Sequence, residues 1–481
     1  MIKNKKPSFA YSVFSLLLIV TIIVIGMLVF DASLQIMLFI GFMTAIPLAM
    51  TIGFSFSEIE TIAYDMIRKA LGPALILLAV GALIGAWMYS GTVPTIIYAG
   101  LALITPEFFL VTTVILCIFV SMATGTSWGT VGTAGVAMIG IGTSLGIPPG
   151  MTAGAIISGA WFGDKMSPLS DSTNMLPALV GTNVYTHIKH MLKTTGPALI
   201  LSLIAFQILN MRFSSSNVNQ TQIDGINSAL SEIFNISWVA AIPAIVVLTL
   251  LLMRKPPVTS IFTGAIIGVI VGISYQGMTI ESGFTALYNG FSIDTGNELL
   301  DGLLNRGGVV SMLDIIALFI FAMGLGGVLS GSGMLGSILE SFASGIKTSR
   351  SILLITVVVT WITNMVGATI TFAHVMTATI MRPLYEKKRI KPENLSRVIE
   401  DSGTLASPII PWNTSAIFAV SALGVGVGEY MPYAFLTYFT LAITIIYSIT
   451  GFTITTYDDD DNVTADKDGD ISELKTKAAN E

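Results

Sequence analysis

Two polar segments interrupt an otherwise apolar chain, and their side chains could bind a cation. The first, Gly159–Asn174, reads GAWFGDKMSPLSDSTN, and the second, Glu400–Ser415, reads EDSGTLASPIIPWNTS. Both contain carboxylate, hydroxyl and amide groups around a Ser-Pro pair, and a proline frees backbone carbonyls by removing a donor. Oxygens of these kinds are the ligands that hard cations such as sodium prefer. We therefore expect the two segments to meet at one cation site, rather than to be ordinary loops with helix caps.

The oxygen-bearing side chains of these segments are the candidate ligands. The residues expected to bind a cation or a proton are Asp164, Ser167, Asp171, Thr173, Asn174, Asp401, Ser407, Asn413 and Thr414. Asp164 and Asp171 are expected to hold sodium, because a carboxylate in a partly dehydrated site can take up either a sodium ion or a proton.

A second pair of segments, rich in Gly, Thr and Ser, could also line the site. Its candidate residues are Thr124, Thr126, Ser127, Asn364 and Thr369. Small residues at this density also allow close helix packing, so packing and site lining both stay open. His374 lies inside an apolar run and either carries protons or packs with a hydrogen bond. His187 and His190 flank Lys189 and are expected in a cytoplasmic surface loop.

These polar segments belong to a pattern that occurs twice in the chain. The matching segments are Tyr89–Thr92 with Gly331–Met334 and Val120–Ser127 with Ile362–Thr369, each 242 residues apart, and Gly163–Pro168 with Gly403–Pro408, 240 residues apart. Two halves of a membrane chain with Gly/Pro-broken polar segments at corresponding positions are typical of secondary transporters.

The composition indicates a membrane protein. Of the 481 residues, 53% are hydrophobic and 11% are charged, and the mean hydropathy is +0.80. The apolar runs are continuous rather than alternating, which excludes a β-barrel. A helix needs about 20 apolar residues to cross a bilayer, so we expect an all-α polytopic fold with roughly 11 to 14 membrane segments, some broken or re-entrant.

The charges of the loops predict that the two halves have opposite orientations. Basic residues mark the cytoplasmic side of membrane proteins. The basic loop around Lys189 and Lys193 corresponds to Val427–Tyr433, which contains Glu429 and no basic residue, and the basic cluster Arg382–Lys391 corresponds to the uncharged Gly140–Pro149. We therefore expect inverted repeats, with both termini in the cytoplasm.

Five regions follow from these patterns. They are an N-terminal helical hairpin and cytoplasmic linker (1–69), the first repeat (70–211), external loops with two connecting helices (212–308), the inverted second repeat (309–456) and a disordered acidic cytoplasmic tail (457–481). The tail accounts for the whole net charge of −6. Cys117 is the single cysteine, which excludes an internal disulfide and a thiol-based metal cluster.

The polar segments resemble those of the NhaC-type sodium/proton antiporter family, within the ion-transporter superfamily. The resemblance rests on Gly159–Asn174, on Gly181–Met191 (GTNVYTHIKHM), on Gly85–Gly91 (GAWMYSG) and on Asp401–Thr414, and it covers nearly the whole chain apart from the acidic tail. It implies exchange of sodium for protons in a bacterial inner membrane. The family's organic-anion members, which exchange malate against lactate with sodium and protons, resemble the chain equally, so that alternative stays open.

Other classes of function are less compatible with the sequence. There is no G-x-x-x-x-G-K-[ST] nucleotide loop, no H-E-x-x-H motif and no sizeable soluble domain, so we expect neither an enzyme nor a resident cofactor. A cation channel with a carbonyl filter is the rival class, but the repeats and charged breaks favour alternating access.

The apolar runs lack the Arg forks that bind dicarboxylates, which favours a bare cation as the transported species. The expected partners are membrane lipid, sodium and protons, with small organic acids as the alternative and no nucleic acid; a homodimer is compatible with the sequence.

Overall fold

The computed structural model describes residues 6–69, 71–103, 106–217, 220–253, 255–296, 298–343 and 348–457, and this part of the chain is built from helices. Its β-structure is limited to an isolated bridge between Ile390 and Thr456. Among the described residues, seven helices are long and apolar enough to cross a membrane, or up to nine if each of two bent pairs counts as one span. The chain is therefore an all-α, multi-pass membrane protein.

This count is lower than the roughly 11 to 14 segments expected, because several apolar stretches form helices that are short or partly polar. Ile242–Leu252 and Phe435–Thr450 are apolar but only 11 and 16 residues long. The helix Pro149–Met166 has 18 residues but carries Asp164 and Lys165 in its last turn, and it is not among the seven. The expected acidic tail, from Asp458 onward, lies outside the described residues.

The first three helices of the chain form a hairpin followed by a surface helix. They are α1 (Phe9–Phe30), α2 (Leu34–Thr51) and α3 (Phe56–Arg68). Helix α3 begins with a capping box, in which the Ser55 hydroxyl accepts from the Glu58 N–H and the Glu58 carboxylate accepts from the Ser55 N–H. Helices α2 and α3 pack against a later helix, α17 (Leu313–Gly331).

Two series of helices follow, joined by a connecting region. The first series is α4 (Leu71–Tyr89), α5 (Thr92–Leu103), α6 (Phe109–Thr124), α7 (Ser127–Thr130), α8 (Val136–Ser144), α9 (Pro149–Met166), α10 (Asp171–Val180) and α11 (Val184–Asn217). The connecting helices are α12 (Gln220–Ile233), α13 (Ile242–Leu252), α14 (Pro257–Ser274), α15 (Ile280–Tyr288) and α16 (Glu298–Leu304). The second series is α17, α18 (Met334–Ala343), α19 (Ser349–Gly367), α20 (Ile370–Lys387), α21 (Pro392–Ile399), α22 (Thr414–Leu423), α23 (Val427–Tyr430) and α24 (Phe435–Thr450).

The turning points of the backbone recur in the two series. Helix α17 begins and ends 242 residues after α4, and α22 begins 243 residues after α10. Left-handed residues that end helices or open turns recur at the same spacing, at Gly91 and Gly333, Gly125 and Ala368, Gly146 and Arg389, and Gly181 and Gly424. A positive φ is uncommon for residues other than glycine, so its recurrence at Ala368 and Arg389 indicates that backbone geometry repeats even where the residue type does not.

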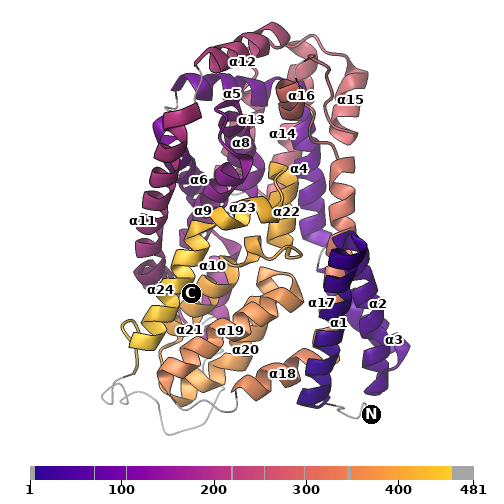
Figure 1. Ribbon diagram of the computed structural model, residues 1–481, viewed down its shortest axis with the longest axis vertical. Coiled ribbons are helices and arrows are strands. Elements are labelled where there is room, and N and C mark those ends of the chain that lie inside the picture. Colours follow the sequence, from indigo (N-terminus) through magenta and orange to yellow (C-terminus); the bar gives the residue numbers. More distant parts are fainter. Residues whose placement is uncertain are drawn as a thin grey trace, which may run out of the picture.

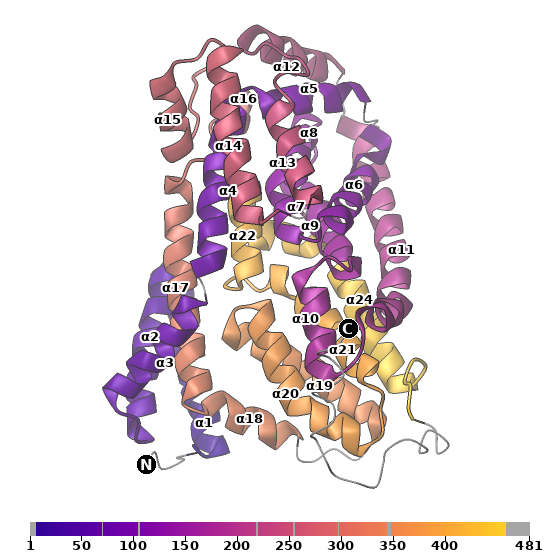
Figure 2. The same cartoon turned by 180° about the vertical axis from the view of Figure 1, so that it is seen from behind.

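Corresponding helices lead to opposite ends of the molecule. Helix α4 leads into α5 at the upper end of Figure 1, whereas α17 leads into α18 at the lower end. The view from behind in Figure 2 shows the same placement of α5 and α18.

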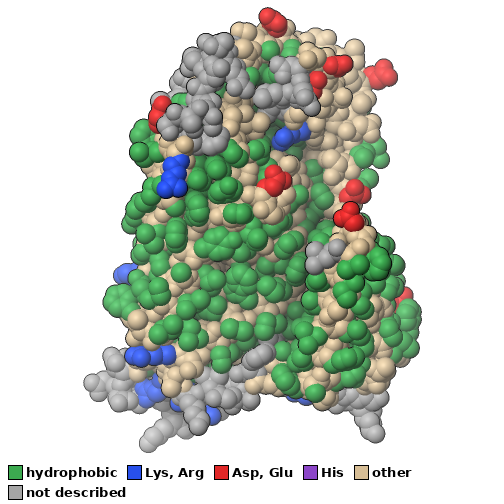
Figure 3. All heavy atoms as spheres, in the orientation of Figure 1, with side chains coloured by type: hydrophobic (Ala, Val, Ile, Leu, Met, Phe, Trp, Pro, Cys, Tyr) green, Lys and Arg blue, Asp and Glu red, His purple; other side chains and the backbone are tan. Residues whose placement is uncertain are grey.

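On the face shown in Figure 3, apolar side chains cover the middle, most Lys and Arg lie at the lower end, and most Asp and Glu lie toward the upper end. An apolar surface between two charged ends is what a membrane-spanning protein requires.

Candidate cation-binding site

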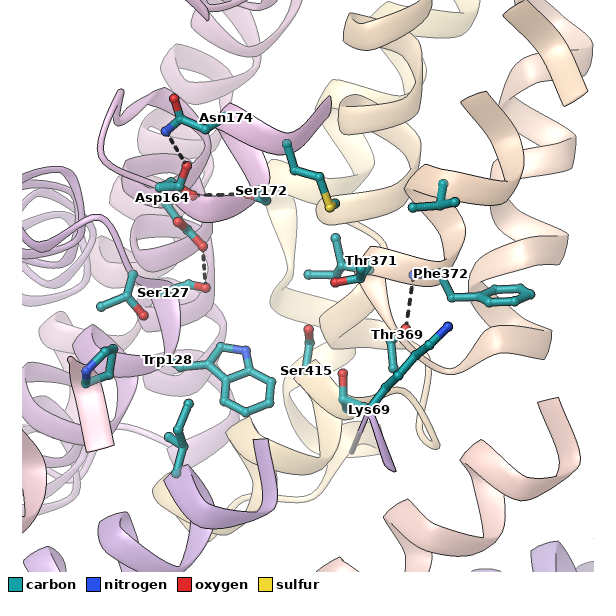
Figure 4. A pocket seen from close by; sticks show the side chains of 18 of the residues that line it. Lys69, Ser127, Trp128, Asp164, Ser172, Asn174, Thr369, Thr371, Phe372 and Ser415 are labelled. Carbon is teal, nitrogen blue, oxygen red and sulfur yellow. Dashed lines mark hydrogen bonds between the residues drawn. The ribbon is translucent and has the colours of Figure 1, made fainter. Parts of the chain in front are cut away.

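A cavity of about 1130 Å³, lined by both apolar and polar side chains, lies where the two series of helices meet (Figure 4). Its polar lining residues from the first series are Thr124, Thr126, Ser127, Asp164, Ser170, Ser172 and Asn174, and those from the second are Ser330, Thr369, Thr371, Thr414 and Ser415. The structure therefore brings residues of both polar breaks and of both Gly/Thr-rich segments to one cavity. The cavity also reaches the exposed residues Asp65, Lys69 and Lys255, which lie outside the breaks.

Close packing of α9 against α6 positions Asp164 on the cavity wall. A Cβ atom added at Gly159 or Gly163 would lie 2.4 Å from the Val114 carbonyl oxygen or 2.6 Å from the Ile118 carbonyl oxygen, so side chains there would force the helices apart. Asp164 follows Gly163 directly and is only 9% exposed. A carboxylate at this point is therefore held by the helix pair and largely shielded from bulk water.

The break between α6 and α7 supplies a hydroxyl to this carboxylate. Helix α6 ends at left-handed Gly125, and the Thr126 hydroxyl accepts from the Gly129 N–H at 3.2 Å to begin α7. This turn aims Ser127 at α9, where its Oγ donates to Asp164 Oδ2 at 2.6 Å. Asp164 and Ser127 together present oxygens to the cavity, as a site for a hard cation requires.

The second series presents hydroxyls to the same cavity from two helix starts. The Thr369 hydroxyl accepts from the Phe372 N–H at 3.1 Å and begins α20. The Asn413 side chain accepts from the Ser415 N–H at 3.0 Å and begins α22. Asn413 also donates to Asn364 Oδ1 at 2.8 Å, which ties the start of α22 to α19 behind the cavity wall.

Several expected ligands are engaged elsewhere and do not line the cavity. Ser167 Oγ donates to the Met122 carbonyl at 2.7 Å, and Ser407 Oγ donates to the Thr404 carbonyl at 2.7 Å. Thr173 Oγ1 lies within 3.2 Å of the carbonyl oxygens of Asp164 and Lys165. These hydroxyls hold the ends of helices in place. Asp171 begins α10, but its side chain lies outside the described residues.

Asp401 is paired inside the protein rather than placed on the cavity wall. It forms an ion pair with Lys165, and both side chains are fully buried. Thr194 and Thr444 donate to Asp401 Oδ2 at 2.7 and 2.8 Å, and Thr195 lies 3.3 Å from Oδ1. The role of Asp401 in cation binding stays a prediction, and in this structure its oxygens are taken up by an ammonium group and hydroxyls.

His374 belongs to a neighbouring buried polar cluster. Its Nε2 lies 3.1 Å from Thr404 Oγ1 and 3.5 Å from Glu400 Oε2. Glu400 and Arg397 are fully buried, and neither is a candidate in the sequence analysis. The sequence indicates that these residues belong together, because Glu400 and Asp401 follow Arg397 by three and four residues and therefore share one face of a helix with it.

His187 and His190 are buried, so their expected place in a surface loop is wrong. Helix α11 begins at Val184 and includes both residues, which are 0% and 4% exposed. His187 Nδ1 lies 2.8 Å from Ser396 Oγ, and His190 Nε2 lies 3.2 Å from the Thr453 carbonyl oxygen. The two histidines lie on the face of α11 that packs against α21 and the segment after α24, while Lys189 between them faces outward.

Within the described part of the chain, no group of three or more His, Cys, Asp or Glu side chains could hold a metal ion. Hydroxyls, amides and backbone carbonyls of the cavity wall, and water, are available as further ligands of a cation at Asp164. Such a weakly charged oxygen site suits a monovalent ion that has to be released again at each cycle.

Comparison with known proteins places the chain in a family. A family model described as the Na+/H+ antiporter family matches residues 3–173 and 159–452. The malate-2H(+)/Na(+)-lactate antiporter of Bacillus subtilis (strain 168) is 40% identical over 421 residues, which cover 88% of this chain and 90% of that protein. The Na(+)/H(+) antiporter NhaC of Alkalihalophilus pseudofirmus is 36% identical over 93% of this chain and 97% of its own length. The NhaC of Bacillus subtilis is 34% identical over 93% and 99%. The chain thus belongs to the Na+/H+ antiporter family.

Proposed function

We propose that the protein exchanges sodium ions for protons across a bacterial inner membrane, with Asp164 as the carboxylate that both ions use. The observation that carries this proposal is the position of Asp164, which is almost buried, bonded to Ser127 and on the wall of the cavity between the two series of helices. A single carboxylate holds either a sodium ion or a proton, so competition between the two ions is sufficient for antiport. Asp171, at the start of α10, is the second carboxylate of this proposal.

Alternating access follows from inverted repeats, which are part of the same proposal. The opposite placement of α5 and α18 in Figure 1 supports inversion, as do the complementary loop charges. The Lys and Arg side chains at the lower end of Figure 3 support a cytoplasmic lower end, with the N-terminus on that side. A site between two inverted halves can open to either face as the halves move relative to one another.

Ion fluxes in proteoliposomes test the role of Asp164. A sodium gradient alone should drive proton movement, and Asp164→Asn should abolish it, because the amide keeps the size of the side chain and removes the charge. Asp294→Asn is the matched control, since Asp294 is an exposed acid that does not line the cavity. Full exchange by both Asp164→Asn and Asp171→Asn would refute the assignment. Accumulation of sodium against its gradient would distinguish the transporter from a channel.

Single cysteines test the inversion. In a Cys117→Ala background, Lys189→Cys and Glu429→Cys should react with a membrane-impermeant thiol reagent from opposite faces of the membrane. Both positions are exposed in the structure, so access from water does not depend on unfolding. If both cysteines react from the same face of the membrane, the two repeats are not inverted.

Exchange of organic acids coupled to sodium and protons is the second candidate. The observation that favours it is the cavity volume of about 1130 Å³, which is slightly above the usual range of pockets for small organic ligands, about 300 to 1,000 Å³. A bare sodium ion needs far less space. Strict dependence of proton movement on an added organic acid would favour this candidate over sodium/proton exchange.

A further inference from the structure

The cavity has two chemically different walls. Figure 4 shows Asp164 and Ser127 on one side and Thr369, Thr371 and Lys69 on the other. We infer that the second wall, which we call the hydroxyl wall (Thr369, Thr371, Thr414, Ser415 and Lys69), binds the carboxylate group of a small organic acid. This inference deepens the proposed function, since it places an anion in the cavity that holds the cation.

The helix starts on the hydroxyl wall favour an anion. Helix α20 has 18 residues and begins after Thr369, and helix α22 has 10 residues and begins at Thr414. Both starts line the cavity, and the start of a helix carries partial positive charge from its backbone N–H groups. At the other end of α22, the Arg306 guanidinium donates to the Leu423 carbonyl at 3.2 Å and meets the partial negative charge of that helix end.

Ser415 supplies an unpaired donor at this wall. Its side chain is 0% exposed and lines the cavity, and among the described residues its Oγ has no hydrogen-bond partner. A buried hydroxyl without a partner is unfavourable, so a group that enters the cavity and accepts a hydrogen bond from Ser415 would be stabilised there. Ser127 on the opposite wall differs, because its hydroxyl is already used by Asp164.

Two lysine side chains reach the cavity in addition to its acids. Among the described residues, the charged ones that line it are Asp65, Lys69, Asp164 and Lys255, and Asp65 already pairs with Arg68 at 3.3 Å. The lysines lie outside the apolar runs, so the sequence does not place them at the site. Their ammonium groups can pair with the carboxylate of an organic anion.

Equilibrium binding to the purified full-length protein tests the hydroxyl wall directly. Isothermal titration would use L-malate and L-lactate as carboxylate probes and chloride as an anion without a carboxylate, first in sodium-free buffer and then with sodium. Wild type should bind the carboxylates and not chloride. Ser415→Ala should bind about tenfold more weakly, the size of one lost hydrogen bond to a charged group. Ser421→Ala on the same helix, whose hydroxyl donates to the Ile417 carbonyl and does not line the cavity, should bind like wild type.

The variant Lys69→Gln is a second test of the inference, at a residue that is not buried. Lys69 is exposed, so Lys69→Gln should leave the fold intact, and it should weaken carboxylate binding. Lys189 is an exposed lysine away from the cavity, so Lys189→Gln should bind the carboxylates like wild type. Wild type that binds neither carboxylate overturns the inference, as does unchanged affinity in both Ser415→Ala and Lys69→Gln. Proton movement driven by sodium alone in wild type is measured separately, so loss of the anion subsite and loss of the proposed exchange are distinguishable.

Discussion

The two polar breaks face one cavity, but they place their carboxylates differently. In the first half, Asp164 lies on the cavity wall with Ser127. In the second half, Glu400 and Asp401 are fully buried behind the wall, and Asp401 is paired with Lys165 from the first half. The comparison shows that a repeated backbone can place its carboxylates in two ways, one on the wall of a cavity and one in an ion pair that joins the halves.

Removing the Asp164 carboxylate should have the largest effect on transport and a small effect on stability. Asp164→Asn should lose sodium-driven proton movement completely while its amide still accepts from Ser127, so the free energy of unfolding should change by less than about 1 kcal/mol. Thermal unfolding in detergent, measured beside the flux assay, checks this. If Asp164→Asn loses transport because it no longer folds, the contrast between a transport role for Asp164 and a structural role for Asp401 is contradicted.

Removing the Asp401 carboxylate should have the largest effect on stability. Asp401→Asn leaves the Lys165 ammonium group buried without its counter-charge, which typically costs about 3 to 5 kcal/mol. The double variant Lys165→Met with Asp401→Leu removes both charges and should recover most of that loss. Unfolding in denaturant measures both. If Asp401→Asn is as stable as wild type but fails to bind sodium, Asp401 belongs to the cation site and the two halves are functionally alike.

The glycine contacts between α6 and α9 should come next in size. Gly163→Ala places a Cβ 2.6 Å from the Ile118 carbonyl oxygen, so the helices must separate, at a cost of about 1 to 3 kcal/mol. It should also weaken sodium binding, because Asp164 is the next residue. Gly336→Ala is the matched control, since nothing lies within 4 Å of its added Cβ, and alanine there should be neutral or stabilising by up to about 1 kcal/mol. Equal stability of the two variants would contradict the packing argument.

Much of this arrangement could be predicted from the sequence, because it depends on composition and local pattern. The apolar runs predict membrane helices, and Pro168, Gly125 and the clustered hydroxyls predict breaks that meet at one site. The alignment of the two breaks differs between sequence and structure. The sequence pairs Pro168 with Pro408, 240 residues later. In the structure the start of α22 comes 243 residues after the start of α10, and this spacing pairs Pro168 with Pro411. On that spacing Asp171 corresponds to Thr414.

The remaining features depend on contacts between distant segments. Lys165 and Asp401 are 236 residues apart, and no local pattern indicates that α11 and α24 enclose them with three threonines. The burial of His187 was missed because nearby lysines gave the segment the charge of a surface loop. Lys69, directly after α3, and Lys255, between α13 and α14, reach the cavity through tertiary packing, and neither belongs to a polar break.

The helix caps should give the smallest and most even effect, and they test whether the halves share a backbone. Thr126 and Thr369 occupy equivalent positions, and each hydroxyl accepts a backbone N–H three residues later, at 3.2 and 3.1 Å. Thr126→Val and Thr369→Val keep the shape of the side chain and remove this acceptor, which should cost about 1 kcal/mol each. Thermal unfolding of the two variants and of Thr379→Val, whose hydroxyl donates within α20 and does not cap a helix, provides the comparison. Similar losses at both caps would support one backbone design in two halves. A loss confined to Thr126 would mean that the second break is held by its asparagines, Asn364 and Asn413, and that the halves have diverged in structure as well as in charge.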